Sequence, residues 1–163
     1  MLLLASCTKK EEAAKMDTSD SSAKMDYPYK IEKPDNWEIG SSENTMVALQ
    51  ALKAWEDGNV DQTLKFFGDS IHLKFDGLDK KISNDSLKIF FTENRNKFKS
   101  IKERVEDWES VISKDKSEEW VTLWYTDIPE TQAGVLDSID IVNDFKLKDG
   151  RIIRIDQYTR KLN

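Results

Sequence analysis

The sequence predicts an α+β domain in which three N-terminal helices pack on a strongly curved antiparallel sheet. Apolar residues recur at helical spacing between residues 41 and 98, whereas apolar and polar residues alternate from residue 101 onward. The last two alternating runs are joined by Asp149-Gly150, a strong signal for a two-residue hairpin. Helices followed by hairpin-connected strands are typical of helices gathered on one face of an antiparallel sheet.

Two helices are expected at the start of this region. Ser41 or Ser42 can cap the first, because a serine hydroxyl accepts a hydrogen bond from the first turn, and Gly58 ends it. Its periodic positions are Thr45, Ala48, Leu49, Leu52 and Trp55. Asn59 can cap a second, shorter helix that Gly68 stops. Its inner face carries Val60, Leu64 and Phe67.

A strand and a third helix are expected next. Ile71, Leu73 and Phe75 alternate with polar residues and predict a half-buried strand, which a turn at Asp76-Gly77 ends. Ser83 or Asn84 can cap the third helix. One side of that helix carries Leu87, Phe90, Phe91 and Phe98.

Four long strands should complete the sheet. They are expected at residues 101–113, 120–128, 134–148 and 151–160, with Pro129 closing the second. In the first strand the apolar parity changes from odd, at Ile101 and Val105, to even, at Trp108 and Ile112, which predicts a bulge near Asp107. A bulge bends and twists its strand, so we expect a cone-shaped sheet with a concave pocket.

The segment before residue 41 is expected to lie outside the domain. Leu3-Leu4-Ala5-Ser6-Cys7 resembles a bacterial lipobox, in which the cysteine is acylated, so residues 1–7 are interpreted as the end of a lipoprotein signal whose beginning is missing. An ordinary thiol at a chance apolar N-terminus is the alternative. Residues 8–40 are interpreted as a disordered tether followed by an extended, aromatic segment from Tyr27.

These features predict a protein held by a lipid on Cys7 at the bacterial outer membrane or cell surface, or facing the periplasm. The run Lys9-Lys10-Glu11-Glu12 resembles the signals that send some Bacteroidetes lipoproteins to the cell surface, although a generic charged linker has the same composition. The net charge is −6 with both signs interspersed, a pattern that does not favour nucleic acid as a partner. One cysteine and one histidine cannot supply a zinc cluster, and the sequence predicts neither a metal nor another cofactor.

The order of these elements resembles the SnoaL-like families of the nuclear-transport-factor-2-like superfamily, also called cystatin-like cone folds. The resemblance runs from about Asn44 to Thr159 and is carried by 49–55, 58–61, 67–73 and the closing run 149–158. It implies the cone fold. It does not imply one activity, because members include isomerases, cyclases, dehydratases, hydrolases and proteins that only bind or dimerise.

Catalytic members of that superfamily place an Asp, or an Asp with a His, in the pocket. Asp137 shares the parity of Ile139 and Ile141 and is the better candidate for an inward carboxylate, the alternative being a strand end in solvent. His72 is the second candidate, although alternation places it opposite Ile71 and Leu73. The expected ligand-binding residues are Trp55, Trp120, Trp124, Tyr125, Gln157 and Tyr158. The alternative for the aromatic rings is that they simply fill the core.

The sequence therefore favours a lipid-anchored envelope protein whose cone binds a small apolar molecule or a protein partner without catalysis. Two alternatives stay open. One is an enzyme of SnoaL or ketosteroid-isomerase type that moves a proton in the cone, and the other is an interaction module that forms a homodimer through its sheet.

Overall fold

The computed structural model describes residues 26–33 and 36–161. The chain divides into two units, Met1–Pro34 and Asp35–Asn163. Residues 26–33, the described part of the first unit, contain no helix or strand. Every element below belongs to the second unit.

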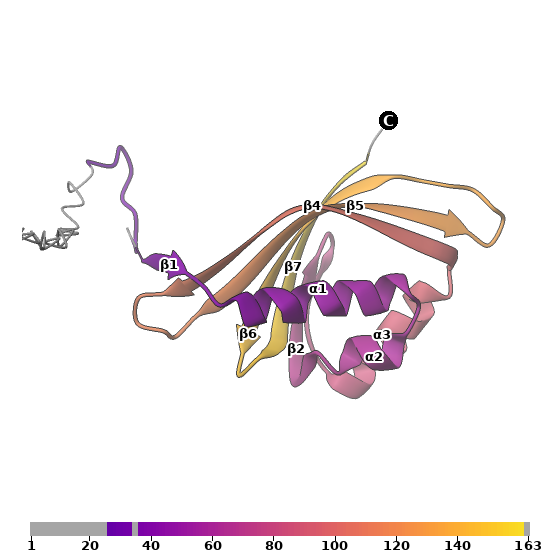
Figure 1. Ribbon diagram of the computed structural model, residues 1–163, viewed down its shortest axis with the longest axis horizontal. Coiled ribbons are helices and arrows are strands. Elements are labelled where there is room, and N and C mark those ends of the chain that lie inside the picture. The colour runs from indigo at the N-terminus through magenta and orange to yellow at the C-terminus, as the bar shows by residue number, and fades with distance from the viewer. Residues whose placement is uncertain (1–25, 34–35, 162–163) are drawn as a thin grey trace, which may run out of the picture. The chain divides into compact units, whose positions relative to one another are not determined.

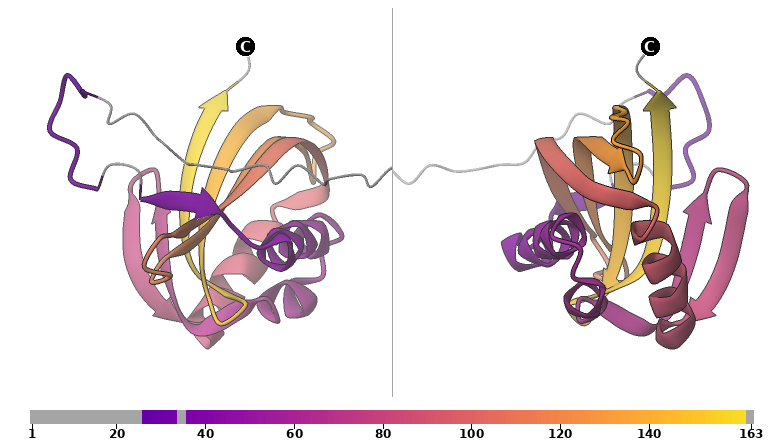
Figure 2. Two further views of the ribbon diagram at one scale, coloured as in Figure 1. Left: turned by 60° about the vertical axis from the view of Figure 1, so that its left-hand side comes forward. Right: turned by 90° about the vertical axis from the view of Figure 1, so that its right-hand side faces the viewer.

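The second unit is an α+β domain with three helices among its described residues, as the sequence predicts. The elements in chain order are β1 (Trp37–Ile39), α1 (Ser42–Glu56), α2 (Val60–Leu64), β2 (Phe67–Phe75), β3 (Leu78–Ser83), α3 (Asn84–Arg95), β4 (Phe98–Ser113), β5 (Glu119–Thr131), β6 (Ile139–Lys148) and β7 (Arg151–Lys161). The strands form one sheet in the order β1-β4-β5-β6-β7-β2-β3. All three helices lie on the same side of this sheet (Figures 1 and 2).

The sheet is mixed, so the prediction of a purely antiparallel sheet is wrong. Strand β2 runs parallel to β7, whereas the other neighbouring strands pair antiparallel. Alternation in a sequence specifies which side chains share a face, but it does not specify the direction of a strand relative to a distant neighbour.

Two short strands at the sheet edges were not expected from the sequence. Strand β1 has only three residues, all exposed, and pairs with the end of β4. Strand β3 follows the expected turn at Gly77, whose φ is +73°, and forms a hairpin with β2. Its sequence, LDKKIS, has too few apolar residues to show alternation.

Some expected boundaries are wrong because tertiary packing overrides local signals. Phe67 and Gly68 belong to β2 rather than to the second helix, and the ring of Phe67 packs edge-on against Phe91 with centroids 5.6 Å apart. Phe98 begins β4 rather than extending the third helix. Pro129 lies inside β5, which continues to Thr131. A proline is tolerated there because β6 no longer pairs with β5 beyond Asp127, so that part of β5 is close to an edge.

Strand β6 is shorter than expected, since the prediction began it at residue 134. Gly134 has a φ of +78° and turns the chain, so Val135 is exposed in the connection between β5 and β6. The expected bulge is confirmed: the β4–β5 register shifts between Val105 and Asp107.

The helix caps follow the sequence closely. Ser41 accepts a hydrogen bond from the backbone N–H of Glu43 at 3.0 Å, and Asn59 and Ser83 cap α2 and α3 in the same way. The buried core lies between the helices and the inner face of the sheet. Its fully buried members include Ala48, Ile71, Leu87, Leu123 and Ile152.

Candidate active site

A cavity of about 290 Å³ lies between the helices and the inner face of the sheet. Its walls are mostly apolar, as is usual for sites that bind small organic molecules. Six aromatic side chains from the helices, β2 and the start of β4 line it: Trp55, Phe67, Phe75, Phe90, Phe91 and Phe98. Contacts between rings fix part of this wall, because Trp55 lies 5.3 Å from Phe91 between centroids.

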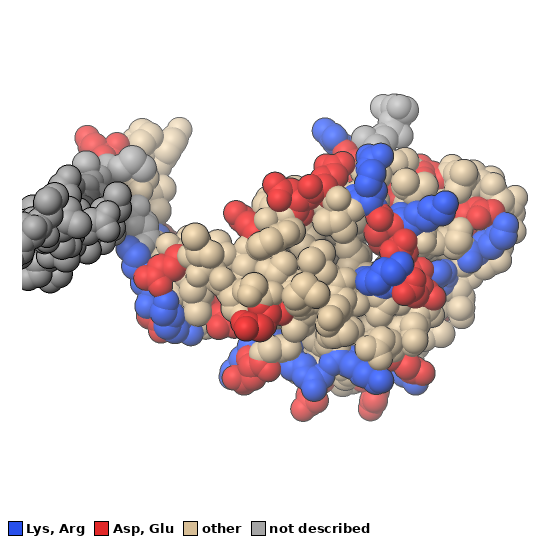
Figure 3. Space-filling model, in the orientation of Figure 1, with Lys and Arg blue, Asp and Glu red and all other residues tan. Residues whose placement is uncertain are grey.

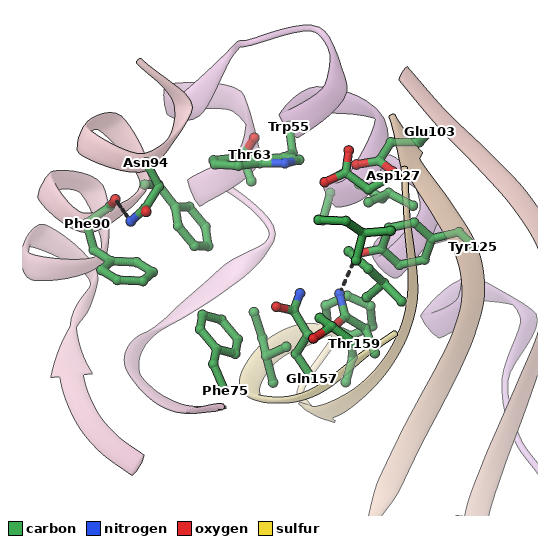
Figure 4. Close-up of a pocket in the computed structure, with 18 of the residues that line it drawn as sticks. Trp55, Thr63, Phe75, Phe90, Asn94, Glu103, Tyr125, Asp127, Gln157 and Thr159 are labelled. Atoms are coloured by element: carbon green, nitrogen blue, oxygen red, sulfur yellow. Dashed lines mark hydrogen bonds between the residues drawn. The ribbon is translucent and has the colours of Figure 1, made fainter. Parts of the chain in front are cut away.

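Two carboxylic acids, Glu103 of β4 and Asp127 of β5, interrupt this apolar lining. They are direct cross-strand partners in the β4–β5 register, so their side chains leave the sheet on the same face. Figure 4 shows their carboxyl groups side by side, near Trp55 and Tyr125 and across the cavity from Gln157. Glu103 Oε2 and Asp127 Oδ1 are buried and have no hydrogen-bond partner among the described residues.

Burial in this cavity shifts both acids toward their protonated forms. Desolvation, and secondarily the charge of Asp127, raises the pKa of Glu103 to about 9. Desolvation also raises the pKa of Asp127 to about 6, while the Arg95 guanidinium opposes this rise. At neutral pH the pair therefore holds about one proton, with Glu103 as the acid and Asp127 as the base.

A hydrogen-bonded polar group adjoins the acid pair. Asn143 Nδ2 donates to the hydroxyl of Tyr125 at 2.8 Å, and Gln157 also hydrogen bonds to Tyr125. Burial and the nearby charges of Glu103 and Asp127 raise the pKa of Tyr125 well above its usual range, so its hydroxyl stays neutral. Asn143 is 5% exposed, and its Oδ1 is buried without a partner among the described residues.

Arg95, the last residue of α3, joins the elements around this wall. Its guanidinium donates to the backbone carbonyls of Trp55, Glu56 and Phe98 at 3.1–3.3 Å. Carbonyls at the end of a helix lack intrahelical partners, so Arg95 satisfies the end of α1 and ties it to the start of β4. It thereby fixes the backbone of Trp55 in the cavity wall.

Three of the six expected ligand-binding residues line the cavity, namely Trp55, Tyr125 and Gln157. Trp120, Trp124 and Tyr158 do not line it. Trp120 instead packs against Lys146 and Arg154, whose charged groups lie 5.3 and 5.4 Å from its ring centroid. Tyr158 is 62% exposed and shares the outer face of the sheet with Trp124.

The two expected catalytic residues also lie outside the cavity lining. His72 is on the outer face of β2, opposite the buried Ile71 and Leu73, and its Nε2 lies 2.5 Å from Asp79 Oδ1. Asp137 is exposed in the connection that precedes β6, so it does not point to the inner face as its parity predicted. Alternation does not apply to Asp137, because β6 begins only at Ile139.

The acid pair that the structure brings together was missed. Its signal was nevertheless present: Glu103 has the parity of Ile101 and Val105, and Asp127 that of Leu123 and Tyr125. A charged residue at the apolar parity of a strand points into the core.

Cys7 lies outside the described residues. Within the described ranges, no helix is long and apolar enough to cross a membrane, and no group of three or more His, Cys, Asp or Glu is arranged to hold a metal ion. Acidic and basic side chains are interspersed over the domain face shown in Figure 3.

Comparison with known proteins identifies the fold but no family. No family model and no curated protein sequence matches this chain. Among solved structures, AusH from Aspergillus nidulans is similar with a TM-score of 0.61 and 19% identity, over 77% of this chain and 89% of that one. An LEH-like epoxide hydrolase from M. tuberculosis has a TM-score of 0.60 and 15% identity over 74% and 84%. An NTF2-like protein of unknown function from Exiguobacterium has a TM-score of 0.57 and 16% identity over 71% and 99%.

These similarities, and one to a protein described as having a cystatin fold, show that the chain has the nuclear-transport-factor-2-like, or cystatin-like, fold. At such low identities they extend to the fold alone, because proteins of this architecture differ widely in function.

Proposed function

We propose that this protein is an acid–base enzyme that moves a proton on a small, uncharged, largely apolar molecule held in the cavity. The observation that carries the proposal is the facing pair Glu103 and Asp127, two acids with raised pKa values in an apolar, aromatic-lined cavity. Titratable groups whose environments separate their pKa values are typical of catalytic acid and base assignments. This replaces Asp137 and His72 with a pair that lies inside the cavity.

The two acids divide the work of a proton transfer. Asp127, ionised at neutral pH, takes a proton from a carbon of the substrate, while the protonated Glu103 gives its proton to the substrate oxygen on which negative charge develops. The pair holds one proton before and after this step, so the reverse transfer to another carbon completes an isomerisation. The aromatic walls hold the apolar body and exclude water, which strengthens both interactions.

The fold is compatible with such chemistry. One similar structure is that of a protein described as an LEH-like epoxide hydrolase, which shows that the architecture supports an enzyme on a small molecule. We also propose that the sheet wraps the cavity as a cone whose entrance admits the substrate.

A generic proton-abstraction probe tests the proposal without knowledge of the natural substrate. In 5-nitrobenzisoxazole, removal of the ring C–H proton breaks the N–O bond and yields a coloured nitrile phenolate. We expect the wild type to open this probe with a rate that rises with pH to a plateau above the Asp127 pKa of about 6. The Asp127→Asn variant should lose about 100-fold or more of this rate, as expected for removal of a general base.

Two variants sharpen the assignment. Glu109→Gln alters an exposed acid on the same strand as Glu103 and should leave the rate unchanged. Asp137→Asn alters the earlier candidate for the base and should retain most of the activity. Full activity in Asp127→Asn, with loss in Asp137→Asn, would show that the base has been assigned to the wrong residue.

Binding without catalysis is the second candidate function, and the apolar lining favours it. The same cavity would then retain a small apolar ligand but turn nothing over. Native mass spectrometry of the purified protein, combined with the probe assay, separates the two functions. A retained ligand together with a rate equal to that of Asp127→Asn supports binding alone.

The location of the protein is also a proposal, and its support is the lipobox-like run ending at Cys7. A diacylglyceryl group on Cys7, observed by mass spectrometry of the native protein, would place the domain at the envelope membrane. An unmodified Met1 would contradict the anchor.

The proposed homodimer, formed through the outer face of the sheet that bears Trp124 and Tyr158, is tested by light scattering of the purified chain.

A further inference from the structure

Several side-chain oxygens in the cavity wall are buried without a hydrogen-bond partner. Glu103 Oε2, Asp127 Oδ1 and Asn143 Oδ1 are the buried side-chain atoms without a hydrogen-bond partner among the described residues, and all three residues line this one cavity. Unpaired buried polar atoms are rare in native proteins, and several in one cavity indicate a missing donor. The proton on Glu103 supplies one donor to this group of oxygens, and the acceptors that remain favour a ligand that brings N–H groups with it.

The charge of the cavity lining favours a donor that is itself positively charged. Its described lining contains two carboxylic acids and no lysine, arginine or histidine. A buried carboxylate without a cationic partner is unfavourable, and a cation that enters beside it relieves that penalty. The charge of Arg95 acts on Asp127, but its guanidinium donates its hydrogen bonds to three backbone carbonyls rather than to the carboxylate.

The walls suit the same ligand. The faces of aromatic rings attract cations, and tryptophan does so most strongly. Trp55 lies nearer to the acid pair than Phe90 does (Figure 4). The ring of Phe91 contacts both, with centroids 5.3 Å from Trp55 and 6.1 Å from Phe90. An organic cation can thus pair its charge with the acids and place its hydrocarbon against the rings.

We propose that the cavity binds hydrophobic ammonium ions, whose N–H groups donate to Glu103 and Asp127 and whose hydrocarbon packs against Trp55 and the phenylalanines. The inference concerns the site of the proposed function and adds a ligand class to it. A bound ammonium ion occupies the acid–base pair, so it blocks proton transfer rather than undergoing it.

A metal ion fits the cavity less well than an ammonium ion. Calcium takes six to eight oxygen ligands and magnesium an octahedral shell, roughly, whereas the cavity offers two acids among hydrocarbon walls. No arrangement of three or more metal-ligating side chains exists within residues 26–33 and 36–161. Both acids line the cavity and are half-buried as residues.

Protonation of the pair should compete with the ammonium ion. The charged or titratable groups that act on Asp127 and Glu103 are the two acids themselves, Glu56 of α1, Arg95 of α3 and Asp137 before β6. Tyr125 adjoins them in its neutral form. With a pKa of about 6 for Asp127, the ionised fraction falls about tenfold between pH 7 and pH 5, and the affinity should fall with it.

The test compares 2-phenylethylamine with 2-phenylethanol, a neutral ligand of nearly the same size, by isothermal titration calorimetry on the full chain. We expect the amine to bind at least tenfold more tightly at pH 7, and about tenfold more weakly at pH 5 than at pH 7. Asp127→Asn should erase the preference for the amine, and Glu103→Gln should reduce it. The control Glu109→Gln should keep it. Circular dichroism establishes that each variant is folded.

The outcomes separate this inference from the proposed function. Equal binding of amine and alcohol, or a preference that survives in both Asp127→Asn and Glu103→Gln, overturns the ammonium site. If the wild type nevertheless opens 5-nitrobenzisoxazole, the acid–base function stands without it. If the amine is preferred by a protein that does not open the probe, the ammonium site stands and the enzyme proposal fails. Competitive inhibition of probe opening by the amine supports both.

Discussion

Replacement of Glu103 by Gln should stabilise the protein, and more so at higher pH. In the folded state burial raises the pKa of Glu103 from 4.5 to about 9, whereas in the unfolded chain it returns to the ordinary value. Between these values the folded state binds more protons, so stability is full below pH 4.5 and declines as pH rises toward 9. Glutamine has the shape of the protonated acid and does not titrate.

The size of this effect follows from the shift. At pH 7 the pH is about 2.5 units above the unfolded-state pKa of Glu103. At about 1.4 kcal/mol per unit, keeping the buried carboxyl protonated therefore lowers the free energy of unfolding by about 3 kcal/mol. Partial solvent access to Glu103 reduces this to about 1 to 2 kcal/mol. At pH 5 the same reasoning leaves a few tenths of a kcal/mol, so the advantage of Glu103→Gln should grow by about 1 kcal/mol between pH 5 and pH 7.

Urea unfolding at pH 5, 6, 7 and 8, followed by tryptophan fluorescence, measures this difference directly. The control is Glu109→Gln, which alters an exposed acid on the same strand and should follow the pH dependence of the wild type. If the curves for wild type and Glu103→Gln run parallel from pH 5 to pH 8, the carboxyl group of Glu103 is not buried as the structure has it, and the acid pair loses its basis.

Three further predictions concern the frame around the cavity. Arg95→Leu removes donors from three backbone carbonyls and should destabilise the domain by about 2 to 3 kcal/mol, measured by urea unfolding; an unchanged midpoint would contradict the bonds at the end of α1. Gly40→Ala places a Cβ atom 2.8 Å from the backbone N of Val111 and should cost about 1 to 3 kcal/mol, which thermal unfolding would detect as a lower Tm. Leu123→Ala empties a fully buried position at the centre of β5 and should cost about 3 kcal/mol, whereas Val105→Ala, at a position 41% exposed, should cost much less.

The acid pair shows what a sequence can and cannot specify about a site. The parity of Glu103 and Asp127 places both on the inner face of their strands, so each is separately predictable as an inward acid. Their meeting depends on the register of β4 against β5, which the bulge between Val105 and Asp107 shifts by one residue. Register over a turn of several residues is a tertiary property, and the sequence alone does not set it.

Alternation would also have sorted the aromatic residues. Trp124 precedes Tyr125, and Gln157 precedes Tyr158, so only one member of each pair can face the cavity. The structure places Tyr125 and Gln157 inside and their neighbours outside. The expectation that all of them converge on the cavity is therefore wrong, because neighbouring residues of a strand point to opposite faces of the sheet. The helix caps succeed because a cap is local and involves only the first turn.

The placement of the acid pair also argues for its use. Two acids directly opposite each other in a sheet cannot both ionise without repulsion, and burial of unpaired carboxyl oxygens is unfavourable as well. Gln at 103 and Asn at 127 would remove the charges with almost no change in volume, so a chain shaped by stability alone has easy alternatives. The helix caps, the core and the hairpin all follow the rules for stable structure, whereas the acid pair in the cavity wall does not. Such a local exception is expected at a functional site. The variant Glu103→Gln is therefore expected to be more stable than the wild type but to lack the proton donor of the proposed reaction. A gain in stability together with a loss of activity would indicate that the pair is kept for its chemistry.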